Sequence, residues 1–146
     1  MSILVQKFGG TSVGSIERIK SVAKRIARSK DLGNELVVVV SAMGNTTDEL
    51  TNLSKAISNN PPQRELDMLL STGEQVSIAL LAIALNELGV SATSMTGTQV
   101  GIVTESSHGK ARILEIKTQR IKNLIEQGEV VVVAGFQGVS ISSGGT

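Results

Sequence analysis

The chain contains no cysteine, and several other residue types are scarce. Its 146 residues include two prolines, and Phe8 and Phe136 are its only aromatic residues. The lack of cysteine excludes disulfides, thiolate metal sites and a cysteine nucleophile. A single histidine, His108, cannot form a metal cluster, and we assign it no role. Two phenylalanines offer no platform on which nucleic-acid bases could stack.

Charge of either sign is not in excess. The 14 lysines and arginines nearly balance the 13 acidic residues, and the net charge of +1 gives no electrostatic reason to expect nucleic-acid binding. The longest apolar stretch, Val76 to Leu85, is too short to span a bilayer. The first residues lead directly into a strand-like run with no signal-peptide pattern. We therefore expect a cytoplasmic protein that binds neither nucleic acid nor membrane.

Strand-like runs alternate with helical periodicity along the chain. We predict strands over residues 3–8, 36–40, 92–96, 101–104, 111–116 and 130–134. We predict helices over residues 16–26, 46–57 and 71–88, a short helix after Pro62, and a helix around residues 121–125. The alternation predicts a doubly wound α/β fold with a mainly parallel sheet.

Three helix starts carry N-cap signals. Ser15 is placed to cap the first helix. Thr46 and Glu49 form a Thr-x-x-Glu capping box, and Ser71 and Glu74 form a Ser-x-x-Glu box. From the residues alone, capping is the preferred role for Glu74. A ligand role is compatible with it, because a helix start is a natural place for a ligand.

Three loops that follow apolar strands carry glycine or small polar residues: Gly9–Ser12, Ser41–Thr47 and Gly135–Gly138. In open α/β sheets, ligands bind outside the carboxyl ends of the strands. In the first loop, consecutive glycines and a following helix suit a phosphate, and Lys7 would add positive charge. The spacing matches neither a P-loop nor a dinucleotide fingerprint. Phosphate binding and a plain strand-to-helix turn therefore both remain open from spacing.

The segment Val5–Val13, with the sequence Val-Gln-Lys-Phe-Gly-Gly-Thr-Ser-Val, closely resembles the opening signature of aspartate kinases. Further segments resemble that family in the same order: Val39–Gly44, Asn45–Leu50, Leu69–Glu74, Ser107–Ile113 and Val133–Gly138. Together these matches cover essentially the whole chain. The resemblance implies an amino-acid kinase (carbamate-kinase-like) fold, a three-layer α/β/α sandwich with a mainly parallel sheet.

The resemblance also implies an activity and site residues. Aspartate kinases transfer the γ-phosphoryl group of ATP, bound with Mg²⁺, to the side-chain carboxylate of L-aspartate. The product, 4-phospho-L-aspartate, feeds lysine, threonine and methionine synthesis. By resemblance, Lys7 is the catalytic candidate, and Thr47 and Glu74 would bind aspartate, with Glu74 pairing with the α-ammonium group. The residues implied in binding ATP or its phosphates are Lys7, Phe8, Gly9, Gly10, Ser12 and Ser41. The full-length family implies a homo-oligomer.

The chain departs from the family at its C-terminal end. The family's Gly-Arg-Gly-Gly-Ser-Asp segment, its later nucleotide-binding half and its regulatory domains are absent. We therefore expect residues 1–146 to be the N-terminal portion of an amino-acid kinase domain, with an exposed sheet edge and little activity alone. Three alternatives stay open. These are another amino-acid kinase, a truncated product that associates with an intact kinase, and a generic phosphate- or nucleotide-binding domain.

Overall fold

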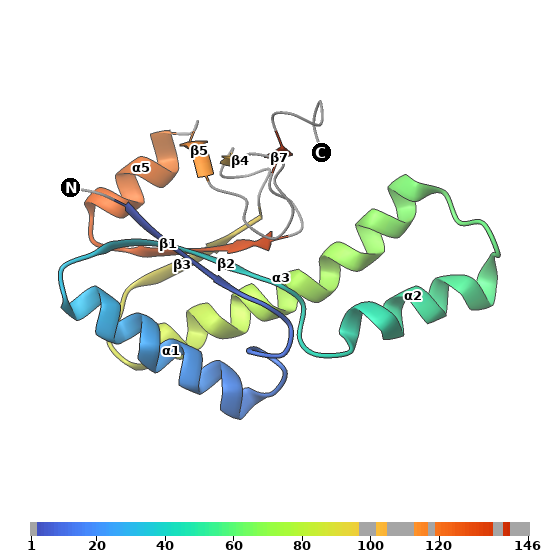
Figure 1. The fold of residues 1–146 in the computed structure, drawn as a ribbon, viewed down its shortest axis with the longest axis horizontal. Helices are drawn as coiled ribbons and strands as arrows, with labels where there is room; N and C mark the ends of the chain where they lie inside the picture. The colour runs from blue at the N-terminus through green and yellow to red at the C-terminus, as the bar shows by residue number, and fades with distance from the viewer. Residues whose placement is uncertain (1–2, 97–101, 105–112, 117–118, 136–138, 141–146) are drawn as a thin grey trace.

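The computed structural model describes residues 3–96, 102–104, 113–116, 119–135 and 139–140 (Figure 1). The helices are α1 (Ile16–Asp31), α2 (Thr46–Ile57), α3 (Gln63–Glu87) and α5 (Gln119–Glu126). The strands are β1 (Ile3–Phe8), β2 (Glu35–Val40), β3 (Ala92–Met95), β4 (Ile102–Thr104), β5 (Ile113–Ile116), β6 (Val130–Ala134) and β7 (Val139–Ser140). The predicted strands and most of the predicted helices are thus confirmed. His108 lies outside the described residues.

The main sheet has the order β1-β2-β6-β3, and all of its strand pairs are parallel. Its two central strands are nearly pure valine runs, which suit a strand covered on both faces. In the register of these strands, Val37 pairs with Val131 and Val40 with Ala134. A smaller sheet has the order β5-β4-β7. The predicted mainly parallel sheet is therefore confirmed.

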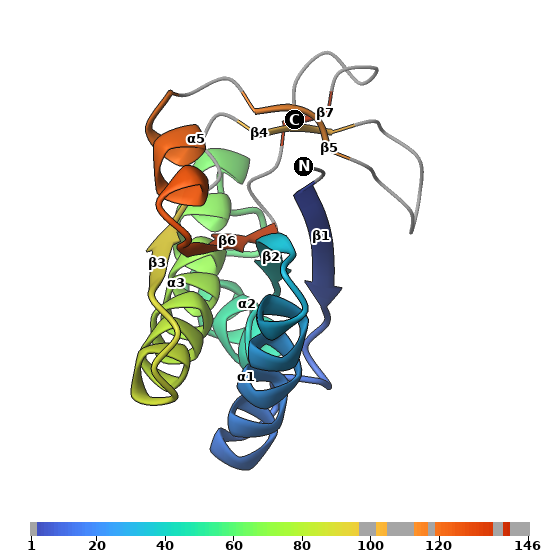
Figure 2. The ribbon, with the colours of Figure 1, turned by 90° about the vertical axis from the view of Figure 1, so that its left-hand side faces the viewer.

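Helices cover both faces of the main sheet. Successive residues of a strand point to opposite faces, so the central valines divide between two cores. Val38, Val40 and Val132 join the core beneath α1 and α3, while Val37 and Val131 join the core beneath α5. Figures 1 and 2 show α1 and α3 on one side of the sheet and α5 on the other. The predicted three-layer α/β/α arrangement is confirmed.

An N-cap residue and apolar residues at helical spacing determine where α1 begins and which face it buries. The Ser15 hydroxyl accepts a hydrogen bond from the backbone N–H of Arg18 at 3.2 Å, which confirms Ser15 as the N-cap. The apolar residues at helical spacing, Ile19, Val22, Ala23 and Ile26, are all buried. This face packs on the sheet and against α3. Helix α1 therefore brings the chain from the glycine loop back along the sheet to the start of β2.

The prediction of two separate helices after Pro62 was wrong, because α3 runs without a break from Gln63 to Glu87. Ser71 lies about two turns inside this helix. Its hydroxyl donates to the carbonyl oxygen of Met68 at 2.8 Å rather than capping a helix start. The predicted Ser71–Glu74 capping box is therefore also wrong. Helix α3 is long and apolar enough to cross a membrane by length and composition, but here its C-terminal half packs in the core.

The predicted Thr46–Glu49 capping box is wrong as well. Helix α2 begins at Thr46, so the N-cap position belongs to Asn45, which makes no side-chain cap hydrogen bond. The backbone N–H of Thr46 donates to the carbonyl of Met43 at 2.9 Å, and its methyl group lies against Gly73 of α3. The side chain of Thr46 thus serves helix packing instead of capping.

The β1 edge of the main sheet is apolar. In the part of the chain that the structure describes, no strand pairs with the outer side of β1. Its residues Ile3, Leu4 and Val5 are 39%, 40% and 41% exposed. The opposite edge strand, β3, has the more polar sequence Ala-Thr-Ser-Met. An open edge with apolar side chains on both faces favours association with another chain or segment.

Candidate functional site

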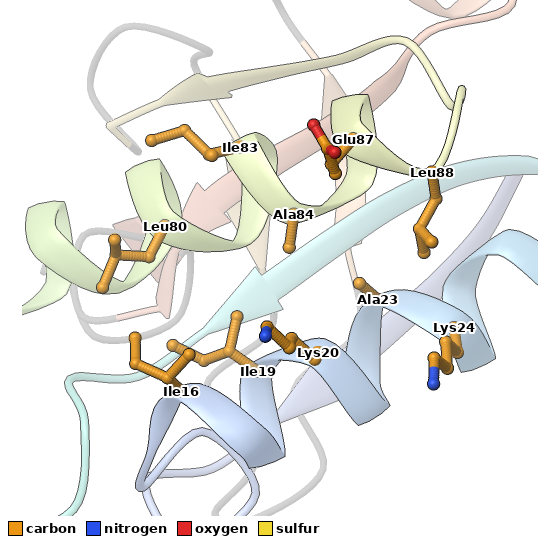
Figure 3. A pocket seen from close by; sticks show the side chains of 10 residues that line it. All are labelled: Ile16, Ile19, Lys20, Ala23, Lys24, Leu80, Ile83, Ala84, Glu87 and Leu88. Carbon is orange, nitrogen blue, oxygen red and sulfur yellow. The ribbon is translucent and has the colours of Figure 1, made fainter.

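Among the hollows on the described part of the molecule, two differ clearly in character. The larger, of about 380 Å³, is a groove between α1 and α3. Figure 3 shows its lining, in which Ile16 and Ile19 of α1 lie across from Leu80 and Ala84 of α3. The smaller, of about 290 Å³, lies at the carboxyl ends of β1, β2 and β6. In parallel α/β sheets this end is where ligands bind, so the smaller cavity is the candidate site.

The smaller cavity gathers residues from β1, α2 and α3 and from the loops that follow β2 and β6. Its charged and hydroxyl-bearing lining residues are Lys7, Ser41, Thr47 and Glu74. These are four of the eight residues predicted for the site from sequence. Lys7 is the last but one residue of β1, Ser41 follows β2, Thr47 is the second residue of α2, and Glu74 lies in α3. The fold therefore brings together residues that are up to 67 positions apart in the sequence.

Backbone hydrogen bonds join the two loops beside this cavity. The N–H of Ser41 donates to the carbonyl of Phe8 at 3.1 Å, and the N–H of Gly44 donates to the carbonyl of Gly10 at 3.0 Å. A Cβ atom at Gly10 would lie 3.0 Å from the carbonyl oxygen of Ala42. Gly10 is thus required for the close approach of the two loops, whatever it binds.

The glycine loop also leaves room for a ligand. A Cβ atom at Gly9 would meet nothing within 4 Å, and Gly9 is exposed. The N–H of Ser12 is engaged, because it donates to the carbonyl of Gly9 at 3.1 Å. Ser12 could therefore contact a ligand through its hydroxyl group but not through this N–H, and Lys7 beside the loop supplies positive charge. An exposed glycine next to a lysine is compatible with a phosphate group, which needs close backbone approach and a cation.

Four of the predicted residues do not line the cavity: Phe8, Gly9, Gly10 and Ser12. The side chain of Phe8 is buried in the core beneath α1, with the guanidinium carbon of Arg25 lying 5.5 Å from its ring centroid. Only the backbone of Phe8 is placed near the two loops. The predicted roles of these four residues in phosphate binding remain predictions.

The opposite wall of the cavity belongs to the two helices. Glu74 is only 6% exposed and sits in the middle of α3, while Thr47 is exposed in the first turn of α2. A buried carboxyl group in the wall of a cavity is a frequent feature of sites that hold ligands. With Lys7 across the cavity, one wall supplies a cation and the other an anion. This arrangement suits a small ligand that carries both charges.

Sequence reasoning missed three lining residues: Ala42, Leu70 and Gly135. None of them carries a reactive group, so their residue types gave no signal. The loop that begins at Gly135 was noted as one of three loops at the carboxyl ends of strands, which was the available clue. A Cβ atom at Gly135 would lie 3.1 Å from the Cγ1 atom of Val39. Gly135 therefore allows the end of β6 to pack closely against β2 beside the cavity.

The groups that line the cavity can position a ligand and neutralise charge on it. Over the described ranges, no group of three or more His, Cys, Asp or Glu side chains could hold a metal ion. One lysine, two hydroxyl groups and one carboxylate line it. Phosphoryl transfer requires this kind of set, because it depends mostly on placing the reactants and stabilising charge.

Known proteins resemble this chain over almost all of its length. Curated relatives include an aspartokinase of Geobacillus stearothermophilus, 64% identical over 96% of this chain, and aspartokinase 2 of Bacillus subtilis, 56% identical over 96% of it. The crystal structure of aspartate kinase from Synechocystis matches with a TM-score of 0.77 at 53% identity, covering 97% of this chain and 23% of that one. E. coli aspartokinase III, solved in complex with aspartate and ADP, shares the fold at 20% identity and a TM-score of 0.70, covering 97% of this chain and 42% of that one.

These matches extend over only part of each relative. The chain spans 34% of the length of both curated relatives named above. It aligns with them as the N-terminal part of the kinase. The model of the amino acid kinase family matches residues 2–144. The chain therefore belongs to the amino acid kinase family.

Proposed function

We propose that this chain is the substrate-binding portion of an aspartate kinase, which transfers the γ-phosphoryl group of ATP to L-aspartate. The observation that carries the proposal is the single cavity that joins Lys7, Ser41, Thr47 and Glu74 at the carboxyl ends of parallel strands. Relatives that are 50–64% identical over nearly the whole chain are named aspartokinases or aspartate kinases, which supports the same activity here.

Each of the four charged or hydroxyl-bearing lining residues would have a role in this reaction. The ammonium group of Lys7 would neutralise charge on the phosphate groups of the nucleotide, beside the exposed backbone of Gly9. The carboxylate of Glu74 would pair with the α-ammonium group of aspartate, and the hydroxyl of Thr47 would hydrogen-bond to the amino acid. Ser41 lies in the loop between these groups and would contact both substrates. The Mg²⁺ that usually accompanies ATP would be held largely by phosphate oxygens.

The chemical step forms one bond and breaks one. An oxygen of the aspartate side-chain carboxylate attacks the γ-phosphorus of ATP, and the bond from that phosphorus to the β,γ-bridging oxygen breaks. The products are 4-phospho-L-aspartate and ADP. The carboxylate is already ionised near neutral pH, so the step needs no protein base. We propose that this step opens lysine, threonine and methionine synthesis, in a cytoplasmic enzyme whose longer form is a homo-oligomer.

A chimera tests the proposal in an intact enzyme. Residues 1–146 of this chain would replace the matching third of the Geobacillus stearothermophilus aspartokinase, to which they are 64% identical. ATP-dependent product formation is measured by trapping the acyl phosphate with hydroxylamine. We expect the chimera to phosphorylate L-aspartate and the 146-residue chain alone to show little turnover. We expect Lys7→Ala in the chimera to lower turnover by about 100-fold or more, because it removes a charge that stabilises the transition state.

The control for Lys7 is Lys24→Ala, which removes a lysine from the apolar groove and leaves the cavity intact. It should leave turnover unchanged. A chimera that acts on glutamate or acetylglutamate but not on aspartate would instead identify another amino-acid kinase. An inactive chimera whose chain nevertheless co-purifies with an intact kinase would favour a non-enzymatic product that associates with such an enzyme. ATP binding that is indifferent to aspartate would indicate a generic nucleotide-binding domain.

A further inference from the structure

The one glycine of α3, Gly73, lies in the middle of the helix, directly before Glu74. Glycine is unfavourable in a helix interior, because it loses more backbone freedom than alanine. The described glycines with positive φ are Gly33, Gly44, Gly89 and Gly128, so Gly73 has no backbone conformation that would require glycine. The reason for a glycine at this position must therefore lie in its surroundings.

At Gly73, α3 lies close to residues of two neighbouring segments. A Cβ atom at this position would lie 2.9 Å from the Cγ2 atom of Thr46, 3.2 Å from the Cβ atom of Ala42 and 3.4 Å from the Cδ1 atom of Leu50. Carbon atoms in contact prefer separations of about 3.5–4.0 Å. The methyl group of Thr46 can rotate away, but the Cβ atom of Ala42 moves only with its backbone. A side chain at Gly73 would therefore push these neighbours away from α3.

The neighbours of Gly73 belong to the cavity. Ala42 lines it, Thr46 precedes the lining residue Thr47, and Gly73 itself precedes Glu74. The other side of Ala42 is held by Gly10, whose Cβ atom would lie 3.0 Å from the carbonyl oxygen of Ala42. Ala42 is thus packed closely between two glycines, Gly10 and Gly73. One of these belongs to the predicted phosphate loop and the other to the helix that carries Glu74.

We propose that Gly73 is a positioning residue, which sets the separation between Glu74 on α3 and Thr47 on α2 and so fits the cavity to a small amino acid. This inference rests on the proposed function, because it assigns Thr47 and Glu74 to the same ligand. A helix pair forced apart would leave one of the two groups out of reach of a short substrate. The nearest atoms that a Cβ atom at Gly73 would meet belong to Thr46, Ala42 and Leu50, so we expect the largest displacement on the side of Thr47 and Glu74.

Steady-state kinetics of the chimera test this separation of roles. We expect Gly73→Ala to raise the KM for aspartate by about 10-fold and to leave the KM for ATP within about twofold. Thr46→Ser removes the methyl group that the new Cβ atom would meet at 2.9 Å. The double variant should therefore reverse at least half of the rise in the logarithm of the KM for aspartate. Thr46→Ser alone should change this KM by no more than about twofold. An unchanged KM for aspartate, an equal rise in both KM values, or no recovery would each overturn the proposal.

Unfolding of the 146-residue chain in urea separates this inference from the proposed function. An alanine that met no obstacle would raise the unfolding midpoint, because alanine favours a helix over glycine. We expect Gly73→Ala to lower the midpoint instead, and Thr46→Ser to restore part of it in the double variant. A raised midpoint would overturn the proposed contact. If the chimera with Gly73 intact did not use aspartate, the proposed function would fail. The unfolding midpoints would still show whether a side chain at position 73 collides with Thr46.

Discussion

Helix α3 has two halves with different surroundings. Over residues 77–85 its apolar face is in the core, and the buried side chains are Ser77, Ile78, Leu81, Ala82 and Leu85. Over residues 63–70 none of its side chains is buried, and the same is true of all of α2, which pairs with it. Figure 1 shows the two helices extending as a hairpin beyond the sheet. The cavity residues Leu70 and Glu74 lie where one half gives way to the other.

The difference shows how one helix serves stability and binding at once. The core half anchors α3 to β6, β3 and α1, while the hairpin half carries one wall of the cavity on a segment with little burial. Segments with few buried contacts open more readily than the core. Changes in the core half should therefore alter the free energy of unfolding, and changes at the junction should alter ligand binding. Changes at the hairpin tip should alter neither by much.

The largest effect is expected for Leu81→Ala in the core half. Leu81 is fully buried beneath the sheet, so its removal leaves a cavity lined by apolar side chains. The free energy of unfolding should fall by about 2–5 kcal/mol. Urea denaturation followed by circular dichroism measures it. Met68→Ala, in the hairpin half at 61% exposure, is the matched control and should cost less than about 0.5 kcal/mol. Equal losses in the two variants would contradict the division of α3.

The second effect is expected at the junction. Glu74→Gln keeps the shape of the side chain and removes its negative charge. A hydrogen bond to a charged group contributes about 1.5–3 kcal/mol, so binding of aspartate should weaken by roughly 10–100-fold while ATP binding is retained. Kinetics of the chimera measure both substrates. Glu65→Gln, an exposed position in the first turn of α3, should change neither value. A weaker affinity for ATP alone would assign Glu74 to the nucleotide instead.

The sequence predicted elements whose signals are local. Ser15 and the apolar residues of α1 stand at helix spacing, and the valine runs of β2 and β6 suit only a strand that is buried on both faces. Gly89 and Gly128, just beyond the ends of α3 and α5, have φ of 84° and 85°, a conformation in which glycine commonly ends a helix. Each of these features depends on a few residues that are neighbours in the sequence, so it can be predicted without knowledge of tertiary packing.

The sequence misled where tertiary packing decides. Ser71, Thr72 and Gly73 look like a break between helices, because all three are weak helix formers. In the fold, the hydroxyls of Ser71 and Thr72 donate to carbonyls one turn earlier, at 2.8 Å and 2.7 Å, within a helix that runs unbroken through them. Gly73 contacts Ala42 and Thr46, which are distant in sequence. A reading of adjacent residues cannot show this packing.

Four of the seven residues that line the candidate site could be named from the sequence, for a clear reason. The residues Lys7, Ser41, Thr47 and Glu74 carry groups that have chemistry of their own, and they line one cavity. Phe8 illustrates the limit, because Lys7 and Phe8 are neighbours in a strand and point to opposite faces. Ala42, Leu70 and Gly135 shape the cavity by position alone. Residues of that kind become visible only once the chain is folded.

The smallest effect is expected at the hairpin tip, where Ile57 is 90% exposed. Ile57→Ser should change the free energy of unfolding by less than about 0.5 kcal/mol, because an exposed apolar side chain gains almost nothing on folding. Ile78→Ser is its counterpart in the core half, where the side chain is 3% exposed, and should cost at least about 2 kcal/mol. Urea denaturation of both variants measures the contrast. A loss above about 1 kcal/mol for Ile57→Ser would mean that the hairpin tip is covered in solution, and the division of α3 would then hold only for an isolated chain.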